Sequence, residues 1–257
     1  MIRGLYTAAT GMDAGLRRQD AISHNLANVG TAGFKREQVL FQSMLAREIY
    51  RYSSSAPPAY LGLIGAGVNY TLGAPDMSAG MPLRTDSPLD IALIDSGQAT
   101  TFLAVEDAQG QRAYTRNGQM LVDGNGYLRT IAGAYVLGRT WAGGAERLRV
   151  SNPDELRIAT DGTLSVGGAR LGQLYLVNPA ADATLTRRGD SLWQIDGQVQ
   201  AVADPHVEQG YIEQANVQVV KEMVNLIAAM RNYETHAKII QIQDETLNKA
   251  VNEAGRV

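Results

Sequence analysis

Three histidines, at positions 24, 206 and 236, are the residues of this 257-residue chain that most readily bind metal ions or transfer protons. They lie far apart in the sequence, and no two of them have the spacing of a helical metal site such as His-x-x-x-His. The chain contains no cysteine, which excludes disulfides, thiolate metal sites and cysteine nucleophiles. We therefore expect no metal site.

Two glycine-containing stretches resemble ligand-binding loops only in part. The stretch Asp-Gly-Asn-Gly at 123–126 lacks the other acidic ligands and the terminal glutamate of a calcium loop, so a hairpin turn is favoured. GLIGAG at 62–67 has neither the order nor the context of the dinucleotide fingerprint. The nucleophile motif Gly-x-Ser-x-Gly and the zinc motif His-Glu-x-x-His are both missing. No motif of these kinds identifies a catalytic residue or a cofactor site.

The overall charge and the apolar pattern exclude two further classes of function. The formal net charge is -3, which gives no reason to expect nucleic acid as a partner. No run of about eighteen apolar residues is present, so we expect no membrane insertion. The N-terminal MIRGLYTAATG lacks the apolar core of a secretory signal, so we expect a protein that is either soluble or exported by a route without a cleaved signal peptide.

The N-terminal region predicts two helices separated by a joint. Apolar residues at 2, 5, 9, 12, 16 and 26 favour an amphipathic helix over Ile2 to Leu26. Gly30 can adopt the left-handed conformation that ends a helix, and Gly33 and Phe34 follow it. From Lys35, the stretch KREQVLFQSMLAREIYR places apolar residues on one side of a second predicted helix.

The middle of the chain has the pattern of a small all-β domain. After Tyr52, a Ser-, Pro- and Gly-rich stretch with little charge predicts a linker or an arm. Short β-type runs interrupted by Asp-Gly and Gly-Gly then follow. QMLVDGNGYLRT and DGTLSVGG are predicted hairpins, and LGQLYLVN alternates as a half-buried strand does.

The C-terminal region predicts one long helix. Val219 begins a heptad pattern that continues at 223, 226, 230, 233, 237, 240, 244, 247 and 251 and is interrupted only by Asp244. A helix over 217–252 would be about 54 Å long, too long for the β domain to cover. We therefore predict an α+β protein with terminal helices in a coiled-coil-like axial domain and an inserted antiparallel β domain. The expected divisions are 1–52 (helical), 53–82 (arm), 83–210 (β domain) and 211–257 (helix).

The ends and the middle of the chain resemble one protein family. LYTAATGM with DAISHNLANVGTAGFK near the N-terminus, and GYIEQANVQVVKEMVNLIAAMRNYETHAKI near the C-terminus, are similar to the two terminal signatures of bacterial flagellar axial proteins. The Tyr-Thr-Arg-x-Gly hairpin from Tyr114 to Gly118 is similar to the β-domain entry of that family. The closest resemblance is to basal-body rod proteins of the FlgF and FlgG type.

This resemblance implies a structural subunit of the rod in the flagellar basal body, within the cell envelope. It implies no catalytic residues, no cofactor and no enzyme activity. It implies export as an unfolded chain by the flagellar type III export apparatus, followed by polymerisation into a drive shaft that transmits torque from motor to hook. The expected partners are further copies and other rod and hook subunits, and a surrounding ring is left open. A chain with no cysteine and 6% aromatic residues suits transport in the unfolded state.

The terminal helices are expected to form the contacts between subunits. The predicted contact residues are Leu5, Met12, Leu16, Asn25, Leu26 and Asn28 near the N-terminus, and Met223, Leu226, Met230, Tyr233, Ile240 and Leu247 near the C-terminus. The joint is expected at Gly30, Gly33 and Phe34. The two asparagines could instead cap the first helix, and Phe34 could anchor the core.

Several alternatives stay open. The C-terminal stripe could form an autonomous coiled-coil dimer. The chain could be a hook or hook-junction subunit, although its β domain is short for a hook protein, or more remotely an envelope hydrolase. Within the rod, the ending NKAVNEAGRV and the short middle slightly favour the proximal, FlgF-like type, while the opening MIRGLYTAATGM suits the distal, FlgG-like type equally.

Overall fold

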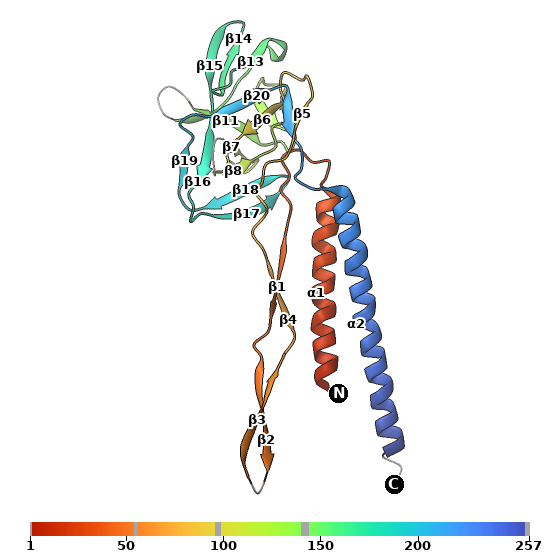
Figure 1. The fold of residues 1–257 in the computed structure, drawn as a ribbon. Helices are drawn as coiled ribbons and strands as arrows, with labels where there is room; N and C mark the ends of the chain where they lie inside the picture. The colour runs from red at the N-terminus through yellow and green to blue at the C-terminus, as the bar shows by residue number, and fades with distance from the viewer. Residues whose placement is uncertain (1, 54–55, 96–98, 140–143, 255–257) are drawn as a thin grey trace. The chain divides into compact units, whose positions relative to one another are not determined.

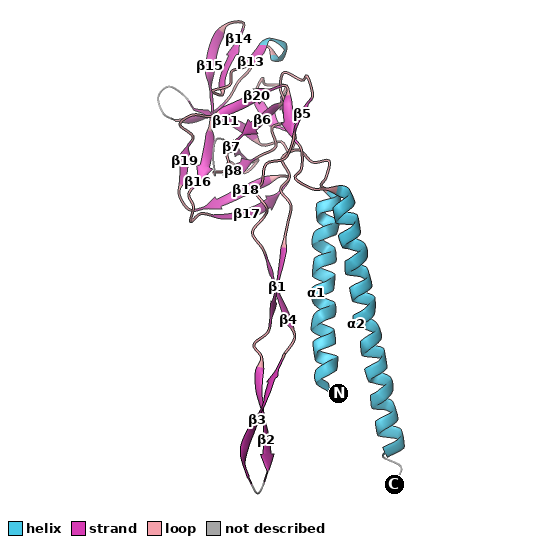
Figure 2. Cartoon of the chain, in the orientation of Figure 1, coloured by secondary structure: helices cyan, strands magenta, loops and turns pink. Residues whose placement is uncertain are grey.

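A computed structural model describes residues 2–53, 56–95, 99–139 and 144–254 (Figure 1). Two long helices and many antiparallel strands make the fold α+β (Figure 2). The chain separates into two compact units, which we call the terminal unit and the β unit. The terminal unit combines Met1–Ala27, Glu37–Pro75 and Gln218–Val257, and the β unit combines Asn28–Arg36 with Asp76–Val217.

The terminal unit contains both helices, α1 (Ile2–Ala27) and α2 (Val219–Ala254), in agreement with the two terminal helices expected from the sequence. They lie side by side and antiparallel, since Gly4, Gly11 and Gly15 of α1 approach Gln243, His236 and Tyr233 of α2 in that order. Within the described residues, neither helix has a stretch that is long and apolar enough to cross a membrane.

Glycines of α1 line the contact between the two helices, so α2 approaches α1 closely there. Gly11 comes so close to His236 that a Cβ atom there would lie 2.7 Å from the imidazole Cε1. On α2, buried and half-buried residues recur with alternating spacings of four and three, at 222, 226, 229, 233, 236, 240, 243 and 247. This stripe has the heptad period. It shares positions 226, 233, 240 and 247 with the predicted seam, and its other positions differ from the predicted ones. Asp244, the break in that seam, lies outside the observed stripe and is exposed.

The predicted second helix from Lys35 is wrong, because this stretch is extended. It contains β1 (Val39–Ser43) and β2 (Arg47–Ser53), which pair with β4 (Val68–Leu72) and β3 (Ala56–Ile64) to form a long two-stranded arm. Apolar residues at helical spacing were misleading here, since alternating REIYRY and its β-forming tyrosines find an antiparallel partner later in the same stretch.

The arm is fastened to the side of α1. The N–H group of Val68 donates to Thr10 Oγ1 at 3.4 Å, and the Arg17 guanidinium lies 5.2 Å from the ring centroid of Tyr70. Gly67, with φ of 119°, allows the close approach, because a Cβ atom there would lie 2.5 Å from the Thr10 hydroxyl. The stretch after Tyr52, predicted as a linker or an arm, therefore forms half of a paired arm.

The β unit consists of short antiparallel strands. Among the described residues, thirteen of them form one sheet. These are β7 (Phe102–Glu106), β8 (Arg112–Thr115), β9 (Met120–Val122), β10 (Leu128–Thr130), β11 (Tyr135–Arg139), β12 (Ala145–Arg147), β13 (Leu156–Ile158), β14 (Thr163–Val166), β15 (Ala169–Leu174), β16 (Leu176–Pro179), β17 (Thr184–Gly189), β18 (Leu192–Asp196) and β19 (Val199–Ala201).

Two smaller pairs complete the unit. Strand β6 (Ile91–Ile94) pairs with β20 (His206–Gln209), and β5 (Pro82–Arg84) pairs with β21 (Tyr211–Glu213). A 3-10 turn at Pro153–Glu155 precedes β13. Both predicted hairpins are confirmed, as β9–β10 and β14–β15, whereas the predicted strand LGQLYLVN is divided between β15 and β16 at Tyr175.

The central strand β7 is buried on both faces. Leu103 and Val105 lie in one apolar cluster with residues such as Leu128 and Val136, while Phe102 and Ala104 lie in a second cluster. Trp193 packs edge to face on Phe102 in this second cluster, with ring centroids 6.2 Å apart. The uninterrupted apolar run FLAV is explained by this burial on two sides.

The close approach of α1 and α2 at Gly11 can be tested by substitution. Replacing Gly11 by valine should weaken the pairing of α1 with α2, because the added side chain needs the space that the His236 imidazole occupies. Hydrogen exchange over residues 2–27 should become at least severalfold faster. Gly15→Ala is the matched control, because its nearest neighbour would be 3.9 Å away and alanine favours the helix. Equal exchange in both variants would contradict this packing.

Candidate functional site

A group of buried charges lies where the joint enters the β unit. Lys35, Arg116 and Glu213 have side-chain exposures of 0%, 0% and 4%, and Asp95 completes the group at 16%. We call these four residues the ion cluster. They come from four segments distant in sequence: the joint, the end of β6, the loop after β8 and strand β21. Two cations and two anions balance, which a buried cluster requires.

Glu213 is the centre of the ion cluster. Its Oε1 accepts hydrogen bonds from Lys35 Nζ at 2.8 Å and from the N–H group of Gly80 at 2.7 Å. Its Oε2 accepts one from Arg116 Nε at 2.7 Å. Lys35 Nζ also donates to the Ser78 carbonyl at 2.8 Å. One carboxylate therefore holds the joint, the segment before β5 and the loop after β8 together.

All three guanidinium nitrogens of Arg116 donate hydrogen bonds within the protein. Its Nη1 donates to Asp95 Oδ1 at 2.6 Å and to the Thr101 carbonyl at 2.8 Å, and its Nη2 donates to the Leu93 carbonyl at 3.2 Å. Burial alone would lower the pKa of Arg116, but the Glu213 and Asp95 carboxylates raise it, so the group stays charged. For Lys35, burial and the nearby charge of Arg116 outweigh Glu213 and lower the pKa below its usual 10.5.

The joint packs closely on the same residues. Gly33 has φ of 67° and donates its N–H to the Glu213 carbonyl at 2.7 Å. A Cβ atom on Gly33 would lie 2.4 Å from the Arg116 backbone, so this position requires glycine. Phe34 is 8% exposed, and the guanidinium carbon of Arg187 lies 4.4 Å from the centroid of the Phe34 ring. Arg187 also donates a hydrogen bond to the Lys35 carbonyl. Phe34 is thus a core anchor of the β unit.

Asn216 holds the other side of the joint. Its Oδ1 accepts from the N–H of Arg36 at 2.7 Å, and its Nδ2 donates to the carbonyls of Asp76 and Ser78 at 2.8 and 3.1 Å. Hydrogen bonding by Ser78 lowers the pKa of the Asp76 carboxyl, with a smaller contribution from Arg36. The chain immediately after α1 and the chain immediately before α2 are therefore bound to the same part of the β unit.

The predicted contact residues of α1 differ in their surroundings. Asn25 is 2% exposed, and its amide donates to the Glu37 carbonyl at 3.0 Å and accepts from the Glu37 N–H at 2.8 Å. This amide is used within the chain. Leu16 is 40% exposed, and the remaining predicted residues are half-buried: Leu5, Met12, Leu26 and Asn28. Gly30 is exposed and has open space around its Cα.

The predicted residues of α2 divide into two groups. Leu226, Tyr233, Ile240 and Leu247 are half-buried members of the stripe described above. Met223 and Met230 are 48% and 46% exposed. Val220, Val224 and Ile227 are exposed beside them, at 76%, 61% and 54%. The first three turns of α2 thus carry apolar residues on two faces, of which one is uncovered.

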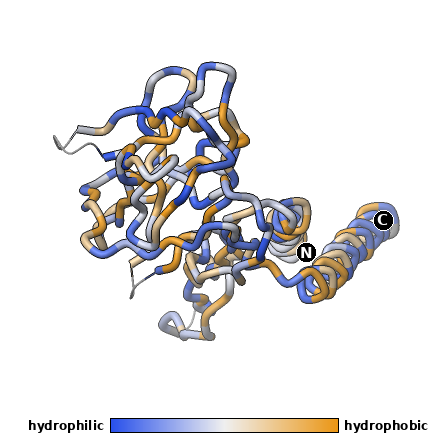
Figure 3. Tube along the Cα trace, turned by 90° about the horizontal axis from the view of Figure 1, so that it is seen from above, coloured by the Kyte–Doolittle hydropathy of each residue, from blue (hydrophilic) through white to orange (hydrophobic). Residues whose placement is uncertain are grey.

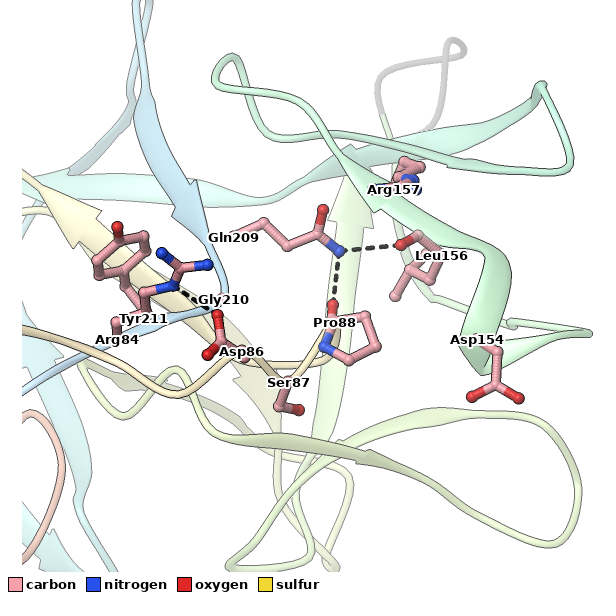
Figure 4. Close-up of a pocket in the computed structure, with 10 residues that line it drawn as sticks. All are labelled: Arg84, Asp86, Ser87, Pro88, Asp154, Leu156, Arg157, Gln209, Gly210 and Tyr211. Carbon is pink, nitrogen blue, oxygen red and sulfur yellow. Dashed lines mark hydrogen bonds and ion pairs between the residues drawn. The ribbon is translucent and has the colours of Figure 1, made fainter.

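An open polar pocket of about 420 Å³ lies in the β unit between the β5–β6 connection, the start of β13 and the β20–β21 connection (Figure 4). Gln209 spans it, with Nε2 donating to the carbonyls of Pro88 and Leu156 at 2.6 and 2.9 Å. Arg84 and Asp86 form an exposed ion pair at its edge. Ser87 is its only hydroxyl besides Tyr211, and none of the described residues that line it is a histidine that could act as a base.

Comparisons with known proteins match three parts of this chain. The family described as flagella basal body rod protein matches residues 5–35, and the flagellar hook protein FlgE/F/G D1 domain matches residues 98–166. The C-terminal domain of flagellar basal body rod FlgEFG proteins matches residues 208–253. Relatives extend over almost the whole chain. FlgG of Buchnera aphidicola subsp. Acyrthosiphon pisum is 34% identical, covering 97% of this chain and 98% of its own length.

The chain belongs to the flagellar basal-body rod protein family. Two further members are the FlgF proteins of Caulobacter vibrioides and Escherichia coli, which are 30% and 31% identical. The first covers all of both chains, and the second covers 97% of each. Rod proteins of both names therefore match the same length of chain with similar identity.

The ion cluster joins the three matched parts of this rod protein. Lys35 ends the N-terminal match, Arg116 lies in the D1 match and Glu213 lies in the C-terminal match. Sequence reasoning missed their pairing, although all three stand in the stretches that carried the resemblance. The available signal was the local setting of each charge: Lys35 follows Phe34, Arg116 lies inside Tyr-Thr-Arg-x-Gly, and Glu213 follows Tyr211-Ile212.

Removal of the central carboxylate should destabilise this rod protein strongly. Glu213→Ala leaves Lys35 and Arg116 buried without it, and breaking a buried pair in this way costs about 3–5 kcal/mol. Urea unfolding of the β unit should show that loss. Glu155→Ala, at an exposed glutamate of the same unit, should leave the unfolding midpoint unchanged. Equal midpoints for the two variants would contradict the role given to Glu213.

Lys35 should make stability depend on pH in a defined direction. The folded chain releases this proton below the usual pKa of 10.5, while the unfolded chain keeps it up to that pH. The unfolded state therefore binds more protons in this interval, and the free energy of unfolding should rise with pH. Lys35→Met lacks this contribution. In urea titrations from pH 7 to 10, wild type should gain stability relative to Lys35→Met, and a constant or falling difference would refute the assignment.

Proposed function

We propose that this chain is a structural subunit of the flagellar basal-body rod, and that copies assemble through uncovered apolar faces of the terminal unit. The observation that carries this proposal is the uncovered face of α2, made up of Val220, Met223, Val224, Ile227 and Met230. Its opposite face packs on α1. A helix that is apolar on both sides belongs in a larger bundle than one chain provides.

The energies favour assembly over an isolated chain. Covering each of these half-exposed side chains contributes about 1 kcal/mol, so five of them supply several kcal/mol per subunit. Figure 3 shows hydrophobic positions recurring along α2, the helix that ends at the C-terminus. On α1, Leu5, Met12 and Leu16 are half-buried or exposed, and they offer a second surface for a neighbouring subunit.

The arm adds a third apolar surface. Leu45 is 92% exposed, Tyr52 79%, Leu63 65% and Leu61 61%, so the paired strands carry large side chains that the single chain leaves in water. Exposed patches of this kind mark contact sites in soluble proteins. Torque would then be shared by helices and arms of many subunits, while the ion cluster holds each β unit as a rigid body.

Export and position in the rod are further parts of the proposal. We infer export as an unfolded chain by the flagellar type III apparatus, since the sequence has no cysteine to cross-link during transit. Other axial proteins are partners at the ends of the segment that this chain builds, and the structural role leaves it without a catalytic one. Rod positions of the FlgF and FlgG type would be separated by complementing a strain that lacks each protein.

The uncovered face of α2 is the part to test. Met223→Asp should abolish rod assembly and motility while the purified chain keeps its circular dichroism and unfolding midpoint. A charge on this face would be buried without a partner in the assembled rod. Glu234→Gln, at an exposed position on the same helix, is the matched control and should retain motility. Wild-type motility of Met223→Asp would refute this interface.

A further inference from the structure

The β unit carries a group of arginines and tyrosines on β10, β11 and β12 and the residues beside them. We call Tyr127, Arg129, Tyr135, Arg147 and Arg149 the Arg–Tyr cluster. The strand register brings its members together, since Arg129 is paired with Tyr135 and Tyr127 is paired with Arg149. None of these residues belongs to the ion cluster or to the terminal unit, so neither role described so far explains them.

The side chains of the Arg–Tyr cluster are stacked. The guanidinium carbons of Arg129 and Arg147 lie 4.4 and 4.2 Å from the ring centroid of Tyr135. The Arg149 guanidinium carbon lies 5.9 Å from that of Tyr127, and the two tyrosine rings meet edge to face at 5.8 Å. Stacking of this kind holds three long cationic side chains in place and lowers the entropy that they lose on binding.

The charges of this cluster are not balanced within the chain. Glu106 pairs with Arg147 at 2.6 Å, with the Arg147 side chain still 42% exposed, and the Asp123 carboxylate accepts from the backbone N–H of Tyr127 at 2.8 Å. Arg129 donates to the Gly133 carbonyl from Nε and Nη2, and Arg149 donates to the Asn125 carbonyl from Nε. Three guanidinium groups against the Glu106 and Asp123 carboxylates leave a net positive patch, and the cited hydrogen bonds use only part of the guanidinium donors.

This chemistry fits a carboxylate-bearing protein surface. Arginine covers Tyr135, so the cluster offers guanidinium donors and not a bare ring on which a sugar or a base could stack. Guanidinium groups bind carboxylates with paired hydrogen bonds, and tyrosine and arginine are the residues most enriched at protein contacts. A patch of three arginines is also too small for the extended basic surface that nucleic acid requires.

We propose that the Arg–Tyr cluster is a contact between copies of this chain, in which carboxylates of a neighbouring copy bind the three arginines. The chain has a net charge of -3 although this patch is positive, so a second copy supplies the complementary acidic surface. Exposed carboxylates of the same unit include Asp154, Glu155 and Asp182. This inference rests on the proposed assembly of the chain as a rod subunit.

A photocrosslinking amino acid tests the contact in assembled rods. Benzoylphenylalanine in place of Tyr127 preserves an aromatic ring at the cluster and reacts with chains that touch it. Irradiation of motile cells should give a product with the mass of two copies, and mass spectrometry should place the second end on a peptide with exposed Asp or Glu. The double change Arg147→Glu and Arg149→Glu should lower the yield at least tenfold, as should Arg149→Glu alone.

Matched positions separate this inference from the proposed function. Arg170→Glu reverses an exposed arginine elsewhere in the β unit and should leave the yield unchanged. The same crosslinker at Met223 reports on the helix interface. A two-copy product from Met223 but none from Tyr127 would overturn the Arg–Tyr contact and leave the rod function standing. No product from either position would overturn both, and a product between Tyr127 and a different protein would overturn the contact between copies.

Discussion

The rest of this structure depends on the hydrogen bonds and ion pairs that the buried carboxylate of Glu213 makes. It binds Lys35 of the joint, the N–H group of Gly80 and the guanidinium of Arg116, and its own backbone carbonyl accepts from Gly33. Desolvation of these charges is costly, and only complete pairing compensates for it. This requirement fixes the path of the chain after α1 and before α2, because both paths pass through the same hydrogen-bond network.

The described residues of the terminal unit are held together by helix packing and not by a buried ion cluster. Its helices meet along glycines of α1, which let the two helices approach closely. Several large apolar side chains of α2 and of the arm are exposed in the single chain. The ion cluster is thus paired within a single chain, whereas in the proposed assembly neighbouring copies would cover the exposed apolar side chains of the terminal unit.

The sequence predicted the elements with strong local signals. The heptad pattern after Val219 and the Asp-Gly and Gly-Gly turns gave the long helix and both hairpins, because period and turn chemistry are local properties. The first half of the arm was predicted as a helix, because the helical spacing of its apolar residues coincides with strand alternation in REIYRY, and only pairing with a later segment decides between helix and strand. The ion cluster could not be predicted, since Lys35, Asp95, Arg116 and Glu213 are brought together by topology alone. Asn25 and Phe34 were predicted as a contact residue and a joint residue, and in the single chain Asn25 bonds to Glu37 and Phe34 lies under Arg187.

Hydrogen exchange on the isolated chain at low concentration tests the central claim most directly, namely that the joint belongs to the β unit and not to the helices that it follows. Residues 28–36 should exchange as slowly as the central strands of the β unit, while the uncovered first turns of α2 exchange faster and become protected in assembled rods. Exchange of residues 28–36 at the rate of the helices would contradict the account, because the ion cluster would then not hold the joint.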